Sequence, residues 1–137
     1  MGFRRASQER VNVFPVDERY LFKHYFDNDE IFDRLRQYYN NQQYRFEVPD
    51  DDFDEIQEFL SEFGYGLVVV DAVAEFAVAV QKYTEHPENI FKDSVVQRSE
   101  GDYNVFVMTD QAAVEQAEVQ GATRLTEADV ALPFSTG

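Results

Sequence analysis

The clearest pattern along the chain is an apolar stripe over residues 50–63, which predicts an amphipathic helix. Its apolar side chains recur at helical spacing and would share one face: Phe53, Ile56, Phe59, Leu60 and Phe63. Aspartates crowd the first turn, where negative charge interacts favourably with the helix dipole. Gly64 follows and is expected to stop the helix.

Shorter apolar runs on both sides of this helix predict β-strands. Residues 44–48 alternate between polar and apolar side chains, and Pro49 closes the run. Residues 67–70 form a continuous apolar run typical of a buried strand, and residues 76–83 alternate again. The connection between these last two runs, residues 71–75, is short, which predicts that they pair as antiparallel neighbours.

The chain before the first of these strands is interpreted as an arm followed by two helices. Residues 1–14 have only weak periodicity. Residues 17–26 predict a helix with one largely aromatic side, made of Tyr20, Leu21, His24 and Tyr25. Asp27 and Glu30 fit a capping box, so a second helix is expected to reach about residue 39.

Residues 87–98 allow two interpretations. Pro87 fits the first position of a helix that runs through the whole segment. Alternatively, a short helical turn at 87–92 precedes a hairpin that pairs residues 94–99 with residues 103–109. The β-branched pair Val95-Val96 and the Glu100-Gly101 turn favour the hairpin.

The remaining segment predicts one helix and one short strand. Asp110 is expected to cap a helix that ends at residue 120, with Gly121 as its stop. Residues 123–125 fit an edge strand. The chain after residue 131 is expected to be loose.

This order of elements predicts the α+β class. The expected architecture is a two-layer sandwich, with an antiparallel or mixed sheet, helices mainly on one face, and N-terminal helices before it. A helix over residues 87–98 would make it ferredoxin-like. A single domain is expected over residues 1–137, with an arm at 1–16, a globular part at 17–131 and a loose tail at 132–137.

Composition narrows the classes of protein that the chain can represent. The 137 residues include 27 Asp or Glu and 12 Lys or Arg, for a net charge of −15. The absence of cysteine excludes disulfides, thiolate zinc sites, iron–sulfur ligation and cysteine nucleophiles. No apolar run approaches the roughly 20 residues of a membrane helix, and the polar start does not resemble a secretory signal. We therefore expect a cytoplasmic protein without a membrane partner.

The acidic excess comes with scarce lysine: three lysines stand against nine arginines. High Asp and Glu, little Lys and no Cys resemble the composition of haloarchaeal proteins, from organisms that accumulate salt in the cell. Salt at about 1 M shortens the Debye length to roughly 3 Å, so dense surface carboxylates hardly repel one another. The alternative is an ordinary acidic protein or an acidic phage-type protein.

Charge is unevenly distributed along the chain. Residues 1–45 hold eight basic and seven acidic residues, a net charge of +1, while residues 46–137 hold four basic and twenty acidic residues, a net charge of −16. Twelve of the 21 aromatic residues lie between Tyr20 and Phe63. A neutral, aromatic-rich region on an acidic protein is a candidate contact surface. The alternative is that these aromatics form an ordinary core.

Motifs for catalysis or cofactor binding are missing, and neither a cofactor nor a metal is expected. The six glycines support no phosphate loop, and the two histidines, His24 and His86, are far apart. The acidic run 50–55 has no calcium-loop spacing and fits a helix start. Asp71, at the end of an apolar strand, could serve as a base or ligand, but a turn-forming role is favoured.

One basic cluster stands out in the acidic part of the chain. It comprises Lys82, Tyr83, His86, Lys92 and Arg98, and no Lys or Arg lies between Arg45 and Lys82. These side chains could donate to a phosphate or carboxylate. Neighbouring acids, namely Glu85, Glu88 and Asp93, could equally pair with them.

No specific activity follows from these patterns, and whether the protein is an enzyme stays open. The favoured interpretation is a non-catalytic interaction or regulatory module, with a protein partner or self-association through residues 1–45. One alternative is an enzyme or binding protein that takes an anionic small molecule or nucleotide at the 82–98 cluster. The other, a nucleic-acid-associated factor using Arg4, Arg5 and Arg10, is disfavoured by the net charge of −15.

Overall fold

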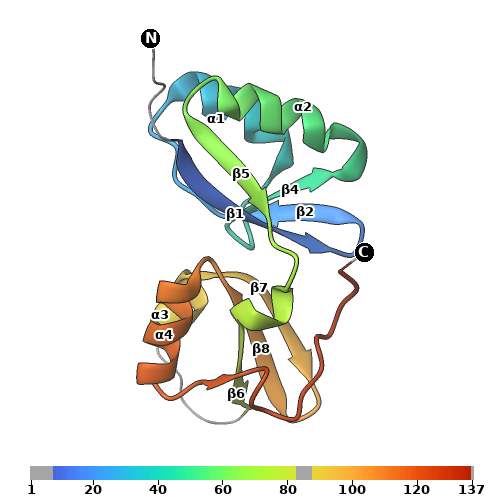
Figure 1. Cartoon of the computed structure of the whole chain (residues 1–137), viewed down its shortest axis with the longest axis vertical. Coiled ribbons are helices and arrows are strands. Elements are labelled where there is room, and N and C mark those ends of the chain that lie inside the picture. Colours follow the sequence, from blue (N-terminus) through green and yellow to red (C-terminus); the bar gives the residue numbers. More distant parts are fainter. Residues whose placement is uncertain (1–7, 83–87, 137) are drawn as a thin grey trace.

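The computed structural model describes residues 8–82 and 88–136 (Figure 1). Its first part contains β1 (Glu9–Val16), β2 (Arg19–Phe22), α1 (Asp29–Leu35), the 3₁₀ turn Arg36–Tyr38, β3 (Tyr39–Asn40), β4 (Arg45–Pro49), α2 (Asp50–Ser61) and β5 (Tyr65–Val69). Its second part contains the 3₁₀ turn Val73–Phe76, β6 (Ala77–Gln81), α3 (Glu88–Lys92), β7 (Ser94–Glu100), β8 (Tyr103–Met108), α4 (Gln111–Val119) and β9 (Thr123–Arg124). The α+β class is confirmed.

The strands form two sheets instead of the single sheet expected. The first has the order β3-β4-β2-β1-β5, and the second has the order β7-β8-β6-β9. Figure 1 shows the first sheet with α1 and α2 in the upper half and the second sheet with α3 and α4 in the lower half. The ferredoxin-like alternative needed a helix over 87–98, but β7 occupies the second half of that segment.

Three apolar clusters separate the layers. One lies between α1, α2 and the first sheet and includes Phe22, Ile31 and Ile56. The middle cluster joins the two sheets and includes Phe14, Val73, Val95 and Val107. The third lies between the second sheet and helices α3 and α4. The order is therefore helices, sheet, sheet, helices, with each sheet covered on both faces.

The predicted helix over 17–26 is wrong, and so is the predicted arm over its described part, because residues 9–22 form a β-hairpin. β1 is buried on both faces: Val13 belongs to the cluster under the helices, whereas Phe14 and Val16 belong to the cluster between the sheets. The hairpin turns at Asp17 and Glu18, with φ of 50° and 70°. Two positive φ values suit a tight hairpin turn whose twist matches the strands.

The predicted antiparallel pairing of residues 67–70 with 76–83 is also wrong. β5 pairs in parallel with β1, and β6 pairs with β8 and β9 in the other sheet. The short connection crosses from one layer to the next through the 3₁₀ turn, whose Val73 is buried between the sheets. Tertiary partners far along the chain therefore decided the pairing.

Several local predictions are confirmed. They are helix α2 with its Gly64 stop at φ 88°, strand β4, the short helix and hairpin over 88–108, and helix α4 capped by Asp110. Helix α1 begins later than expected, because Asn28 and not Asp27 accepts the N–H of Ile31, at 3.1 Å.

From β9 to residue 136 the chain forms no further helix or strand, yet this segment has partners that a loose tail lacks. Phe134 packs against the cluster between the sheets. The Asp17 N–H donates to the Ser135 carbonyl at 2.8 Å. This segment is therefore attached to the β1–β2 turn.

Candidate functional site

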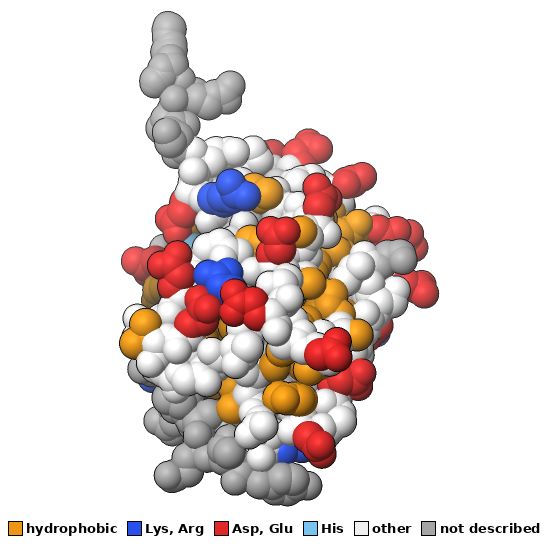
Figure 2. Space-filling model, turned by 60° about the horizontal axis from the view of Figure 1, so that its bottom comes forward, with side chains coloured by type: hydrophobic (Ala, Val, Ile, Leu, Met, Phe, Trp, Pro, Cys, Tyr) orange, Lys and Arg blue, Asp and Glu red, His pale blue; other side chains and the backbone are white. Residues whose placement is uncertain are grey.

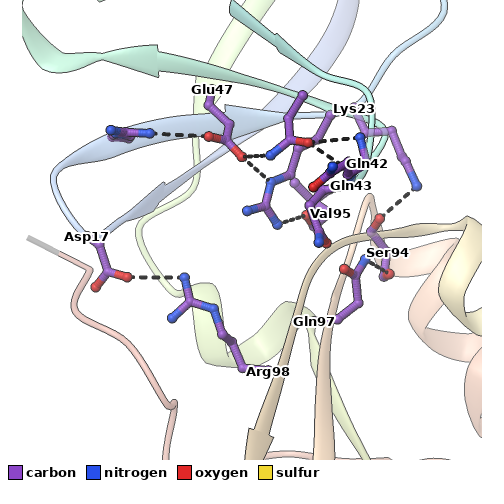
Figure 3. A network of polar contacts seen from close by, with 12 residues as sticks. Asp17, Lys23, Gln42, Gln43, Glu47, Ser94, Val95, Gln97 and Arg98 are labelled. Atoms are coloured by element: carbon purple, nitrogen blue, oxygen red, sulfur yellow. Dashed lines mark hydrogen bonds and ion pairs between the residues drawn. The ribbon is translucent and has the colours of Figure 1, made fainter.

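A hollow of about 310 Å³ opens beside the core between the two sheets. We call it the arginine hollow, and it is lined by Val16, Asp17, Arg19, Leu21, Arg45, Glu47 and Arg98. Its residues come from the end of β1, from the β1–β2 turn, from β2 and β4 of the first sheet, and from β7 of the second (Figure 3). Strands that belong to different sheets and lie far apart in the sequence therefore contribute to one site.

The alternation of side chains along two strands brings the charged groups together. On β4, Phe46 and Val48 point into the cluster under the helices, so Arg45 and Glu47 point the other way, toward the second sheet. On β2, Arg19 and Leu21 share that face, and Leu21 lies directly opposite Glu47. The register of this strand pair thus places Arg19 beside Glu47.

Glu47 is the centre of an ion-pair network. Its carboxylate accepts hydrogen bonds from Arg45 Nε at 2.8 Å, Asn40 Nδ2 at 3.0 Å and Arg19 Nη1 at 3.3 Å. Burial alone would raise the pKa of Glu47, but these donors outweigh it and lower the pKa below its ordinary value. Glu47 is therefore held ionised.

A second ion pair closes the opposite side of the hollow. Arg98 Nη2 donates to Asp17 Oδ2 at 3.2 Å, and the Arg98 guanidinium lies 5.7 Å from the centre of the Phe134 ring. The backbone N–H of Ser135 donates to Asp17 Oδ1 at 3.1 Å. That bond, and secondarily Arg98, lowers the pKa of the Asp17 carboxyl despite some desolvation. In Figure 3, Arg98 points from β7 toward Asp17.

Arg45 and Lys23 also donate to backbone carbonyls of β7 and of the last residue of α3. Arg45 Nη1 donates to the Val95 carbonyl at 3.0 Å, at a bulge where the β7–β8 register shifts. Lys23 Nζ donates to the carbonyls of Lys92 at 2.8 Å and Ser94 at 2.9 Å. Desolvation, and to a lesser extent the nearby Arg45 charge, lower the pKa of Lys23, while Asp93 acts in the opposite direction. These bonds hold the two sheets together at the hollow.

The hollow has more cationic than anionic groups. Three guanidinium groups face two carboxylates in it, although the whole chain has a net charge of −15. Figure 2 shows one face of the molecule, over which many acidic and few basic side chains are spread. Within the described residues, Arg19 and Arg98 each donate one hydrogen bond and Arg45 donates two, whereas a guanidinium carries five N–H groups. Donors for an anion therefore remain.

Two neighbouring hollows extend this surface, and both include Arg19. One, of about 600 Å³, is lined mainly by polar side chains from the 37–42 segment, with Glu47 and Asp52. The other, of about 470 Å³, is lined by Tyr20, Pro49, Asp50 and further residues. The acidic lining of both leaves the arginine hollow as the part best suited to an anion.

The basic cluster expected over 82–98 does not gather at one place. Lys82 follows β6, and its backbone N–H donates a hydrogen bond to the Asp102 carbonyl at the β7–β8 turn. Lys92 precedes the other end of β7, and a seven-residue strand spans about 20 Å. Arg98 joins the arginine hollow instead. Tyr83 and His86 lie outside the described residues.

The remaining candidate residues, His24 and Asp71, do not form a site with other polar groups of the described residues: the first has structural partners, and the second is exposed to solvent. His24 Nε2 lies 2.9 Å from Glu9 Oε2 and packs against the rings of Phe26 and Tyr65. Asp71 is exposed after β5. Within residues 8–82 and 88–136, no group of acidic and histidine side chains is arranged to hold a metal ion.

Sequence reasoning missed Arg19, Arg45 and Glu47. The alternation Arg45-Phe46-Glu47-Val48 was a usable signal, since it places the two charges on the same face. The sequence pattern does not add Arg19 to this face, because residues 17–26 predict a helix. The contribution of β7 depends on how the sheets stack, which no local pattern reports.

Comparisons with known proteins give no further guidance. No protein-family model, no curated protein and no solved structure matches the chain. Among the described helices, none has the length and apolar character needed to cross a lipid bilayer.

Proposed function

We propose that this protein is a non-catalytic interaction module that binds an anionic group, a carboxylate or a phosphate, in the arginine hollow. The observation that carries the proposal is the convergence of Arg19, Arg45 and Arg98 in a chain with a net charge of −15. Planar guanidinium groups recognise both kinds of anion through paired hydrogen bonds. The proposal replaces the 82–98 cluster with a site that shares only Arg98 with it.

The state of the two carboxylates supports binding over proton transfer. A general acid or base works best with a pKa near the working pH. The pKa values of Glu47 and Asp17 are both lowered, so these groups stay charged at neutral pH and hold the arginines in place. An anion that binds without breaking either ion pair would find the remaining guanidinium N–H groups already held in position.

The composition supports a halophilic, cytoplasmic setting for this module. In concentrated salt, long-range attraction is screened, so binding must come from short hydrogen bonds in a defined geometry. Arg45 suits this role, since its side chain is only 11% exposed and is fixed by Glu47 and the Val95 carbonyl. The unfolding midpoint is expected to rise with KCl concentration.

A titration followed by NMR tests the proposal. Inorganic phosphate and acetate are each added to the labelled protein at low and at high KCl, and the backbone and arginine Nε signals are recorded. We expect shifts to concentrate on Arg19, Arg45 and Arg98, and to weaken strongly in Arg98→Gln. Arg36→Gln is the matched control, because Arg36 pairs with Asp33 on the open surface, 67% exposed.

The result that would overturn the proposal is equally specific. If phosphate and acetate shift the signals of scattered surface residues, and Arg98→Gln responds like Arg36→Gln, the hollow does not bind anions.

A further inference from the structure

The outer side of β5 has a row of backbone groups that no second strand of the described residues pairs with. Within the described residues, β5 pairs with β1 alone. The Gly64 carbonyl and the Val70 N–H both bond to β1, at 2.8 Å each. Since backbone groups of a strand point alternately to its two sides, those of Tyr65, Leu67 and Val69 point away from β1. We call these groups the β5 edge.

The other three sheet edges are short or covered. β3 and β9 have two residues each. On β7, the Ser94 and Val95 carbonyls accept hydrogen bonds from Lys23 and Arg45, next to the bulge. Short edges, bulges and covering cations all discourage the addition of a strand. The β5 edge has none of these features.

The β5 edge is also free of charge, which favours a second copy of this chain. All five residues of β5 are uncharged, and Val69 is 36% exposed. From α2, Gln57 reaches the strand and Ser61 accepts from Gln8, so two uncharged side chains border the edge, while the exposed acids Asp54 and Glu58 lie next to them on the helix. Two molecules that each carry a net charge of −15 would repel one another least where such neutral surfaces meet.

We propose that two copies of this chain associate by antiparallel pairing of their β5 edges around a two-fold axis at Leu67. The pairing joins the five-stranded sheet of one copy to the five-stranded sheet of the second copy. Leu67 then faces Leu67 of the second copy and about six backbone hydrogen bonds form. Tyr65 faces Val69 of the second copy, twice by symmetry, and aromatic side chains opposite β-branched ones stabilise antiparallel pairs.

One side chain opposes this association. Gln57 Nε2 donates to the outward Leu67 carbonyl at 3.0 Å, so it occupies the acceptor at the centre of the proposed interface. The dimer forms only when Gln57 releases this carbonyl to the second copy. Gln57 therefore limits the affinity, and its removal should tighten the dimer.

Sedimentation over a wide range of protein concentrations, in concentrated KCl, measures the association. We expect a monomer–dimer equilibrium that Gln57→Ala tightens about three- to ten-fold, as the loss of one competing hydrogen bond implies. Val69→Lys should weaken it at least ten-fold, because it places a charge at the seam. Val119→Lys is the control, since Val119 is 80% exposed on α4 in the other layer.

Amide hydrogen exchange provides a readout that depends on the strand itself. The N–H groups of Tyr65, Leu67 and Val69 should become protected as protein concentration rises, while those of Gly66 and Val68, which face β1, stay protected throughout. A strict monomer in both wild type and Gln57→Ala overturns the proposal and leaves the edge to a strand from another protein. A dimer that leaves the three outward amides unprotected overturns it as well. Neither result bears on the arginine hollow, which lies on other strands.

Discussion

Replacing Arg45 with methionine tests whether the arginine hollow also holds the two sheets together. Met keeps an apolar stem of similar length but removes the charge and every donor. Two specific bonds disappear: the 2.8 Å bond to Glu47 and the 3.0 Å bond to the Val95 carbonyl. Val95 is fully buried, so its carbonyl has little access to water as a substitute.

The expected cost follows from these two bonds. A charge-assisted hydrogen bond contributes about 1.5–3 kcal/mol, and leaving a buried carbonyl unsatisfied costs about 1–3 kcal/mol. Glu47 keeps Arg19 and Asn40 as donors, which moderates the loss. We expect Arg45→Met to lower the free energy of unfolding by about 2–4 kcal/mol.

Urea unfolding followed by circular dichroism measures this change. Arg36→Met is the control, because its exposed ion pair should contribute less than about 1 kcal/mol. A double-mutant cycle with Glu47→Gln should show coupling of roughly 1 kcal/mol or more. If Arg45→Met and Arg36→Met unfold at the same midpoint, the contacts of Arg45 do not stabilise the fold and the reasoning is refuted.

Three further predictions concern stability. Glu47→Gln should weaken the dependence of the free energy of unfolding on pH in the acidic range. Because the folded-state pKa of Glu47 is lowered, its ion pairs stabilise the fold above the ordinary pKa of 4.5, and this stabilisation is lost as pH falls through the lower folded value. Urea titrations that show the same pH dependence in the variant and the wild type below about pH 5 would contradict this prediction. Asp110→Ala should cost about 1 kcal/mol in the same assay, because Asp110 Oδ1 accepts the Ala113 N–H at 2.8 Å as the cap of α4; Asp110→Asn should restore most of it. Phe14→Ala should cost about 3–5 kcal/mol, since Phe14 is fully buried between the sheets, and a loss below about 1 kcal/mol would show that this cluster is loosely packed.

Local features of the fold could be predicted where one face of an element is exposed. Helix α2 has one solvent-exposed and one buried side, and its apolar stripe predicts its type, its start, and its end to within two residues. β1 has no solvent-exposed face at Val13 and Phe14, because both side chains are buried. Its sequence therefore shows neither the polar–apolar alternation of a half-buried strand nor the period of a helix. The turn at Asp17 and Glu18 adds no Gly or Asn to mark it.

The candidate site illustrates a different limit. Clustering along the sequence suggested Lys82, Lys92 and Arg98, but β7 holds its two ends about 20 Å apart. Arg19 and Arg45 are 26 positions apart and meet because β2 and β4 are paired neighbours. Proximity across a sheet depends on register, and register depends on distant partners.

The attachment of Ser135 to the β1–β2 turn has a kinetic consequence. Ser135 and Asp17 are separated by 118 positions, and they exchange two hydrogen bonds. Such a contact can form only after a very long loop has closed, so it contributes nothing to the early stages of folding. We therefore expect this clasp to form late, and to act by slowing the unfolding of the native hairpin more than by speeding its formation.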